Sequence, residues 1–479
     1  MKYFLSIDCG LTKIKIVFYT QKGETVYENS ANTPLVEYKI DTVNLYNKLV
    51  SLICGAFNTD TVKPENIIAV SVSGHGNGLY IIDNTGVYPF GFSSMFNSGK
   101  MEYPETQKTF PITMQSSWGG QPLAILKFLK QNDREIFGSI KKIAFCKDII
   151  RYFITGKIYT DYSDASAAGL LNYKTGNYDS KLMDLYGLGD NMDILPELCR
   201  SDSIVGTVSK DFAKVTGLLT DTPVIGGLFD VNSCMLGVGA IHSDTYCIIA
   251  GTWGINASVV DFPVLSNKIT QCCNFCYPDK YVCIDSAPTS CVNLEWFLNN
   301  VLRQNSYSDA DVLVQNCKFD LDLFYFPYIY LSMDIGVKGG FYGLNATHDY
   351  RDLLRAVFEG IVFEHTYRIE KLRETGIEHN KVILAGGAAN SSVFCQMFAD
   401  TLGMEVHITS QSQTGALGSA IMSSVAVGIY SDIDEAVQNM VKEKAVYKPK
   451  KETQLHQKYI KFKKYLDILK EMGVVKNGL

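Results

Sequence analysis

The opening of the chain alternates apolar and polar positions in a way that predicts several strands around one helix. Residues 3–7 and 14–19 are rich in apolar and β-branched side chains and flank a short turn, so they predict a β-hairpin. A third extended segment follows near 24–27, helical spacing of leucines predicts a helix over 43–57, and 67–73 is a nearly continuous apolar strand. This order predicts an α/β fold.

The second half of the chain repeats the first hairpin. Residues 245–250 and 254–259 are apolar runs on either side of a turn that contains Gly251 and Thr252. Two such hairpins about half a chain apart predict a duplicated domain, in which each half offers a phosphate-binding loop to a shared cleft.

The last third of the chain predicts further helices and strands. Apolar spacing predicts a long helix over 351–375. A strand over 381–384 runs into a Gly-Gly turn and then a helix, which is a natural site for a nucleotide phosphate. Small residues over 414–420 predict a helix that packs closely, and the charged stretch 442–479 predicts a solvated outer helix or tail.

Composition narrows the class of protein. The chain has 479 residues, 46% of them hydrophobic and 20% charged, which is typical of a globular protein. Lys and Arg total 44 against 50 Asp and Glu, so the net charge of -6 argues against a nucleic-acid or anionic-membrane partner. Asp8 interrupts the first apolar run and no run of about 18 apolar residues occurs, so we expect a cytoplasmic protein without a membrane segment.

The cysteines favour reduced core thiols. Thirteen Cys are scattered through apolar segments. Cys272, Cys273 and Cys276, with Cys283, have spacing that resembles a zinc site, but a second CxxC or a His pair is missing. We therefore expect structural thiols there instead of a metal.

The tip of the first hairpin carries Asp8, Gly10 and Thr12. Glycine lets backbone amides approach an anion, the Thr hydroxyl adds a donor, and an Asp beside them can hold hydrated Mg²⁺. An ordinary hairpin turn would use the same residue types, so both interpretations stay open.

Asp230 follows the apolar, flexible stretch 224–229. A carboxylate in a buried segment is costly unless it is paired or used, and a catalytic base is one such use. The alternative is an Asp that caps the helix beginning there. A second polar run over 160–166 is better explained by helix capping than by ligand contact.

His75 and Asn77 lie in a loop with glycines at 74, 76 and 78. The spacing fails G-x-G-x-x-G because Leu79 stands at the last position, and no P-loop motif occurs in the chain. The two side chains either bind a polar ligand or are simply solvated.

Four motifs in one order carry a resemblance. Asp8-x-Gly10-x-Thr12, Gly226 to Asp230, Gly251-Thr252 and Gly386 to Asn390 together resemble the FGGY carbohydrate kinases over nearly the whole chain. The stretch 286–297, together with 227–231 and 251–253, looks most like the L-xylulose kinase branch.

The resemblance implies two actin-like, ribonuclease H-like α/β domains around an interdomain cleft. It places the N-terminal FGGY sugar-binding domain at 1–242, the C-terminal FGGY nucleotide-binding domain at 243–440, and a helical tail at 441–479. Sugar would bind mainly to the first domain and ATP mainly to the second.

The resemblance also implies roles for individual residues. Asp230 would be the base that accepts the proton of the attacking sugar hydroxyl, and His75 and Asn77 would help to hold the sugar. Asp8 would help to hold Mg²⁺. The residues that would bind Mg-ATP are Asp8, Gly10, Thr12, Lys15, Gly251, Thr252, Gly386, Gly387 and Asn390.

Two segments depart from the family pattern. Relatives often carry a Trp-x-Asp-x-Arg segment, but 92–100 has neither Asp nor Arg, which puts the identity of the sugar in doubt. Gln411 and Gln413 stand where an acidic residue is common, which would change nucleotide contacts slightly.

We therefore expect an ATP-dependent kinase of a pentulose such as L-xylulose. The alternatives are a kinase of another pentulose, a polyol or glycerol, or a catalytically silent actin-like sensor of ATP or sugar. The aromatic residues of 324–328 would form core or a homodimer contact, and core is the better expectation.

Overall fold

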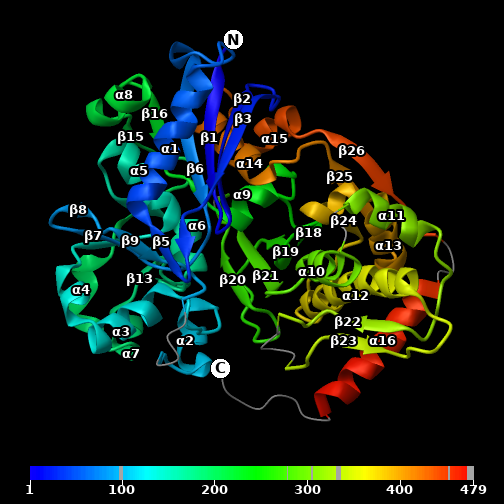
Figure 1. Ribbon diagram of the computed structural model, residues 1–479. Coiled ribbons are helices and arrows are strands. Elements are labelled where there is room, and N and C mark those ends of the chain that lie inside the picture. The colour runs from blue at the N-terminus through cyan, green and yellow to red at the C-terminus, as the bar shows by residue number, and fades with distance from the viewer. Residues whose placement is uncertain (97–100, 278, 304–305, 331–335, 451–453, 472–479) are drawn as a thin grey trace.

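The computed structural model describes residues 1–96, 101–277, 279–303, 306–330, 336–450 and 454–471 (Figure 1). Residues 97–100 of the unusual segment 92–100 lie outside this part, as do 472–479 of the expected tail. No helix within the described ranges is long and apolar enough to span a lipid bilayer.

The first sheet forms around the predicted hairpin. Its strand order is β15 (Ile204–Thr207), β16 (Pro223–Ile225), β6 (Ile67–Gly74), β1 (Tyr3–Cys9), β2 (Lys13–Thr20) and β3 (Thr25–Asn32), with β17 (Leu228–Phe229) also paired to β6. β1 is antiparallel to β2 and parallel to β6, and α1 (Thr42–Phe57) lies between β3 and β6 in the chain. The predicted order of three strands, helix and strand is confirmed, with two short extra strands before α1.

The second sheet repeats this arrangement. Its order is β20 (Gln271–Asn274), β21 (Tyr281–Ala287), β19 (Gly254–Val260), β18 (Tyr246–Ala250), β24 (Lys381–Ala385), β25 (Glu405–Thr409) and β26 (Glu443–Tyr447). β18 is antiparallel to β19 and parallel to β24, as β1 is to β2 and β6. The expected α/β fold with two related, sheet-centred domains is confirmed.

Three layers of helices cover the two sheets (Figure 1). The outer face of the first sheet packs on α1, α5 (Cys146–Thr155) and α8 (Lys210–Thr216). The outer face of the second packs on α10 (Val292–Phe297), α12 (Tyr350–Arg373) and α13 (Ser392–Leu402). Between the sheets lie α9 (Asp230–Gly237), α14 (Thr414–Ala426) and α15 (Ile433–Met440), in a core that both sheets share.

Small residues let α9 and α14 cross at very short range. A Cβ on Gly418 would lie 1.8 Å from the Ser233 carbonyl oxygen, and one on Gly237 would lie 1.9 Å from the Thr414 carbonyl oxygen. Because any side chain at either position would collide with backbone, the close packing predicted for 414–420 is confirmed.

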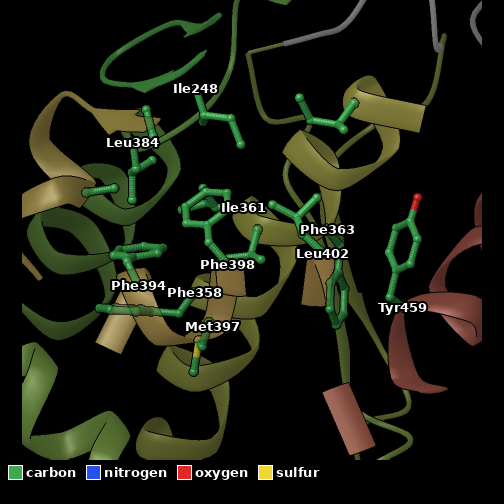
Figure 2. Packing of buried hydrophobic residues seen from close by; sticks show 14 of the residues in the cluster. Ile248, Phe358, Ile361, Phe363, Leu384, Phe394, Met397, Phe398, Leu402 and Tyr459 are labelled. Atoms are coloured by element: carbon green, nitrogen blue, oxygen red, sulfur yellow. The ribbon is translucent and has the colours of Figure 1, made fainter. Parts of the chain in front are cut away.

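The core of the second domain combines aromatic with aliphatic side chains (Figure 2). Phe358 of α12 and Phe394 of α13 are stacked, with ring centroids 4.2 Å apart. The residues Phe324, Tyr325, Phe326 and Tyr328 are all buried, which confirms the expectation that this run forms core.

The C-terminal stretch differs from the prediction. Residues 443–447 form the edge strand β26 instead of helix. The following helix α16 (Gln454–Glu471) is not solvated all round, since Tyr459, Phe462 and Leu466 are fully buried and Phe462 stacks on Phe326. Because many residues of α16 are charged, the sequence pattern did not reveal the apolar stripe by which this helix packs on the core.

Small elements complete the first domain. The helices are α2 (Thr106–Thr113), α3 (Pro122–Asn132), α4 (Arg134–Ser139), α6 (Tyr162–Ala167) and α7 (Ser180–Leu185). The small sheets contain β4 (Leu35–Val36), β5 (Lys39–Asp41) and β9 (Phe90–Phe92); β7 (Tyr80–Asp83), β8 (Gly86–Val87) and β10 (Lys142–Ala144); β11 (Tyr159–Asp161) and β14 (Glu197–Cys199); and β12 (Leu171–Asn172) and β13 (Asn177–Tyr178). The second domain adds α11 (Tyr307–Gln315), β22 (Phe324–Phe326) and β23 (Gly340–Tyr342).

Candidate active site

Asp8 lies near the carboxyl end of β1, beside the start of α14. The Ser73 hydroxyl donates a hydrogen bond to Asp8 Oδ1 at 2.9 Å, and Lys15 Nζ is 4.0 Å from Oδ2. A Cβ on Gly415, in the first turn of α14, would lie 3.4 Å from the carboxylate. The positive end of the helix dipole favours a negative charge at this position.

Lys15 links the first hairpin to the segment before α14. Its Nζ donates to the Gln413 side-chain oxygen at 3.0 Å, and the Tyr19 hydroxyl donates to the Gln413 carbonyl at 3.1 Å. The tip of this hairpin is held by the Gly10 amide, which donates to the Lys13 carbonyl, while Thr12 is exposed.

Asp230 is the first residue of α9, and the N-cap position belongs to Phe229. Asp230 Oδ1 accepts from the Val231 amide at 2.7 Å, so the side chain does not cap the helix as the alternative interpretation required. Burial raises the pKa of the carboxyl to about 7, the charge of Asp8 adds to this effect, and His75 opposes it. A base with a pKa near 7 is well matched to proton transfer at neutral pH.

The loop after β6 carries His75 and Asn77, and it brings His75 close enough to Asp230 for the two charges to interact. The His75 amide donates to the Cys9 carbonyl at 2.9 Å, and its Nε2 is 3.0 Å from the Tyr80 hydroxyl. The His75 ring is buried, so the interpretation that it is solvated is wrong. A Cβ on Gly76 would lie 2.3 Å from the Phe229 ring, which places this loop directly against the residue before Asp230.

Two polar atoms of this loop are buried and unused. Within the part of the chain that is described, His75 Nδ1 and Asn77 Oδ1 have no hydrogen-bond partner. Asn77 also has a φ of 58°, in the left-handed region that is uncommon for residues other than glycine. Buried polar atoms are normally satisfied, so an unused pair beside an unusual carboxyl is typical of a site that receives a polar ligand.

The second group of predicted residues gathers at the second sheet. β18 and β24 are parallel, so the turn with Gly251 and Thr252 and the turn with Gly386 and Gly387 leave the sheet at the same edge. Gly386 has a φ of 83°, and a Cβ there would lie 2.6 Å from the Ala250 carbonyl oxygen. Thr252, Gly386, Gly387 and Asn390 are all exposed at this edge.

His365 supports the second hairpin through hydrogen bonds, and the sequence alone did not identify it. Its Nδ1 is 2.8 Å from Asn256 Oδ1 and its Nε2 is 2.8 Å from Ser290 Oγ. Because Asn256 Oδ1 can only accept, Nδ1 carries the proton and Nε2 accepts from the Ser290 hydroxyl. Burial lowers the pKa of His365 to about 3, so the ring is neutral. The neighbouring Cys291 amide donates to the Gly251 carbonyl at 2.9 Å.

Comparison with known proteins decides the family. The model of the N-terminal domain of the FGGY family of carbohydrate kinases matches residues 3–237, and the model of the C-terminal domain matches 300–427. The chain belongs to the FGGY family of carbohydrate kinases. It is an ATP-dependent enzyme that acts on a sugar or related substrate.

Two relatives align over most of this FGGY kinase. A protein of Haemophilus influenzae described as a probable L-xylulose kinase is 29% identical, over 98% of this chain and all of the relative. The L-xylulose/3-keto-L-gulonate kinase of Escherichia coli is 28% identical over 92% and 91%. The crystal structure of a ligand-bound xylulose kinase from Lactobacillus acidophilus superposes with a TM-score of 0.87 at 22% identity, covering 98% of both chains. That likeness shows the fold.

A buried ionic cluster beneath Asp230 was also missed. Lys147 Nζ lies 2.6 Å from Asp148, 3.0 Å from Asp161 and 3.2 Å from Asp164, and all four side chains are fully buried. Asp161 caps α6 by accepting from the amides of residues 163 and 164, so the capping interpretation of 160–166 is confirmed. From the sequence alone, Lys147 and Asp148 cannot be distinguished from ordinary charged residues at the start of a helix.

The cysteine cluster of this FGGY kinase forms core. Cys272 and Cys273 are neighbours on β20 and pack into different clusters on opposite faces of the second sheet. They cannot coordinate one ion together. Among the described residues, no group of three or more His, Cys, Asp or Glu side chains is placed to hold a metal.

Proposed function

We propose that the chain transfers the γ-phosphate of ATP to a hydroxyl of a pentulose, with L-xylulose as the first candidate, and that Asp230 is the general base. The observation that carries the proposal is the carboxyl of Asp230, whose pKa of about 7 comes from burial beside Asp8 and next to the unused polar atoms of His75 and Asn77. Two full-length relatives named for L-xylulose support the choice of sugar.

Asp230 would accept the proton of the attacking hydroxyl. At pH 7 about half of the Asp230 carboxyls are ionised, and the proton that leaves the sugar has an acceptor in place. Phosphoryl transfer asks a protein mainly for alignment and charge stabilisation, so one carboxylate at the nucleophile is sufficient acid–base chemistry.

His75 Nδ1 and Asn77 Oδ1 would bind hydroxyl or carbonyl oxygens of the sugar. A sugar epimer with one hydroxyl turned away would leave one of these buried atoms without a partner, which is the strongest source of discrimination available to such a site.

The donor set at Asp8 fits Mg²⁺. Mg²⁺ is usually held by one or two carboxylates, several waters and the substrate phosphates, and Lys15 Nζ comes no closer than 4.0 Å to Asp8 Oδ2. Asp8 would hold the ion, usually through water, and the ion would supply charge neutralisation on the phosphates. Gly10, Thr12 and Lys15 would bind phosphate oxygens from the same side.

The nucleotide would bind at the edge of the second sheet. Gly251 and Thr252 would contact phosphates with backbone amides and a hydroxyl, and Gly386, Gly387 and Asn390 would line the nucleotide. All of these residues leave the sheet at one edge, which supports a single binding site for ATP.

The proposed limits of the two domains follow these two binding roles. We propose a sugar-binding domain at 1–242 and a nucleotide-binding domain at 243–440, with 441–479 as an extension of the second. A cytoplasmic location and a homodimer stay predictions, to be tested by cell fractionation and by sedimentation of the purified protein.

The test is ADP release from Mg-ATP across L-xylulose, D-xylulose, 3-keto-L-gulonate, a polyol and glycerol, with a blank that lacks sugar. We expect kcat/KM to be highest for L-xylulose. Asp230→Ala should lower kcat by orders of magnitude while ATP still binds. ADP release by this variant at the wild-type rate would remove Asp230 as the base, and silence of the wild-type protein on every sugar, with ATP bound, would favour a sensor.

A further inference from the structure

The turn that carries Asp230 contains two glycines at positions where any side chain would collide with neighbouring backbone. A Cβ on Gly226 would lie 2.4 Å from the Arg200 carbonyl oxygen, and one on Gly227, which has a φ of 86°, would lie 2.4 Å from the Val72 carbonyl oxygen. These glycines allow a close approach to neighbouring backbone, but they do not fix the conformation of the turn, because glycine is the most permissive residue.

Two hydrogen bonds to buried serines fix the conformation that the glycines only permit. The Phe229 amide, immediately before Asp230, donates to Ser163 Oγ at 3.2 Å. The Gly227 amide donates to the Ser201 carbonyl at 3.2 Å. The turn is therefore held at two points by residues that are distant in sequence.

Both of these serines meet the same carboxylate. The hydroxyls of Ser163 and Ser201 donate to Asp161 Oδ2 at 2.5 Å and 2.7 Å. Asp161 Oδ1 is in turn 3.0 Å from Lys147 Nζ. A single buried carboxylate thus sets the position of both supports of the turn.

The ionic cluster makes this carboxylate rigid. Lys147 is surrounded by three aspartates, and Arg151 donates to Asp148 at 3.2 Å and also contacts the Gly226 carbonyl. Burial raises the pKa of Asp164 well above its usual range, and Lys147 opposes this shift. Because the ion pairs of Lys147 with Asp148 and Asp161 are fully buried, separating them would leave buried charges unpaired, and this cost holds Asp161 in place.

We infer that Asp161, through Ser163 and Ser201, positions Asp230 for proton transfer, so that Ser163 and Ser201 are positioning residues of the reaction. The inference rests on the proposed function, because it requires Asp230 to be the base. Its physical basis is that a displacement of about 1 Å in a reacting group can cost on the order of 100-fold in rate.

Ser163→Ala and Ser201→Ala test the inference. Each removes one hydroxyl from Asp161, and Ser163→Ala also leaves the Phe229 amide without its acceptor. We expect kcat to fall about 10- to 100-fold with the KM for ATP unchanged. As the turn relaxes and Asp230 gains water, its pKa falls, so the acid limb of the pH–rate profile moves to lower pH.

Ser209→Ala is the matched control. The Ser209 hydroxyl accepts from the Phe212 amide at the start of α8, in the same domain, so its loss removes an equivalent hydrogen bond away from the turn. This variant should lose some thermal stability and keep the wild-type kcat and pH profile. A purely structural role for Ser163 or Ser201 would give the same result as this control.

Asp230→Asn, measured in parallel, separates the two hypotheses. Wild-type turnover by Asp230→Asn would remove the base, and with it the proposed function of this residue. Loss of turnover by Asp230→Asn, together with wild-type kcat and acid limb in both serine variants, would overturn the positioning role alone. If Ser163→Ala does not fold, Ser201→Ala, which leaves the Phe229 hydrogen bond intact, decides the question.

Discussion

Replacing Asp230 by Asn should stabilise the protein at neutral pH while it abolishes turnover. Burial raises the pKa of Asp230 from 3.8 to about 7. The folded state therefore holds a proton that the unfolded state releases, and stability falls as pH rises from about 4 to about 7. Asparagine cannot ionise, so the variant does not pay this penalty, and its side-chain oxygen can still accept from the Val231 amide.

The size of the effect follows from the shift. One pKa unit corresponds to about 1.4 kcal/mol, so a shift of about 3 units sets a ceiling of about 4 kcal/mol. Asp230 is partly exposed, and solvent reduces this value, so we expect about 2 kcal/mol above pH 7. For a domain of this size that corresponds to an increase of about 4–8 °C in Tm.

The assay is calorimetric Tm at pH 5, 6, 7 and 8 for the wild type and Asp230→Asn. The difference in Tm should grow between pH 5 and 7 and level off by pH 8. Asp83→Asn is the control, since a hydrogen bond from Thr85 lowers the pKa of Asp83, and all of its titration lies below pH 5. A Tm difference for Asp230→Asn that is constant across this range, or a variant less stable than wild type at pH 8, would refute the buried-carboxyl argument.

Two further predictions concern the supports of the site. Gly418→Ala should destabilise the protein by about 1–3 kcal/mol or more, because its Cβ would lie 1.8 Å from the Ser233 carbonyl oxygen. Gly138→Ala, in helix α4 with open space around it, should be neutral or slightly stabilising in the same thermal denaturation experiment. His365→Asn should raise the KM for ATP several-fold with a smaller change in the KM for sugar, measured by ADP release, since His365 holds the Ser290 loop beside Gly251; an equal change in both KM values would contradict this role.

Sequence periodicity located most of the fold because the two sheets are buried on both faces. Such strands have nearly continuous apolar runs, and both hairpins are local in sequence, so 3–19 and 245–259 were placed correctly. The strand β26 was missed because it is an exposed edge strand with charged residues, which periodicity cannot separate from a solvated helix.

The residues of the candidate site also fall into two groups, those that the sequence indicates and those that only the structure reveals. Asp8, Asp230, His75 and Asn77 stand beside glycines in apolar surroundings, and that local contrast drew attention to them. Lys147 and His365 gave no such signal, because each acquires its role from partners that are distant in sequence, Asp161 in one case and Asn256 in the other. Tertiary contacts of this kind cannot be read from spacing.

The crossing of α9 and α14 connects these observations. α9 begins with Asp230, and the first turn of α14 lies against Asp8 of β1, so each carboxylate lies at the start of one of two helices that touch through Gly237 and Gly418. Because those glycines leave no room for slippage, a shift of one helix must move the other. The same helices form the core shared by both sheets, so a motion of one sheet relative to the other would displace α14 relative to Asp8 or relative to α9, which carries Asp230. The geometry of the reacting groups and the packing between the domains are therefore one structural feature.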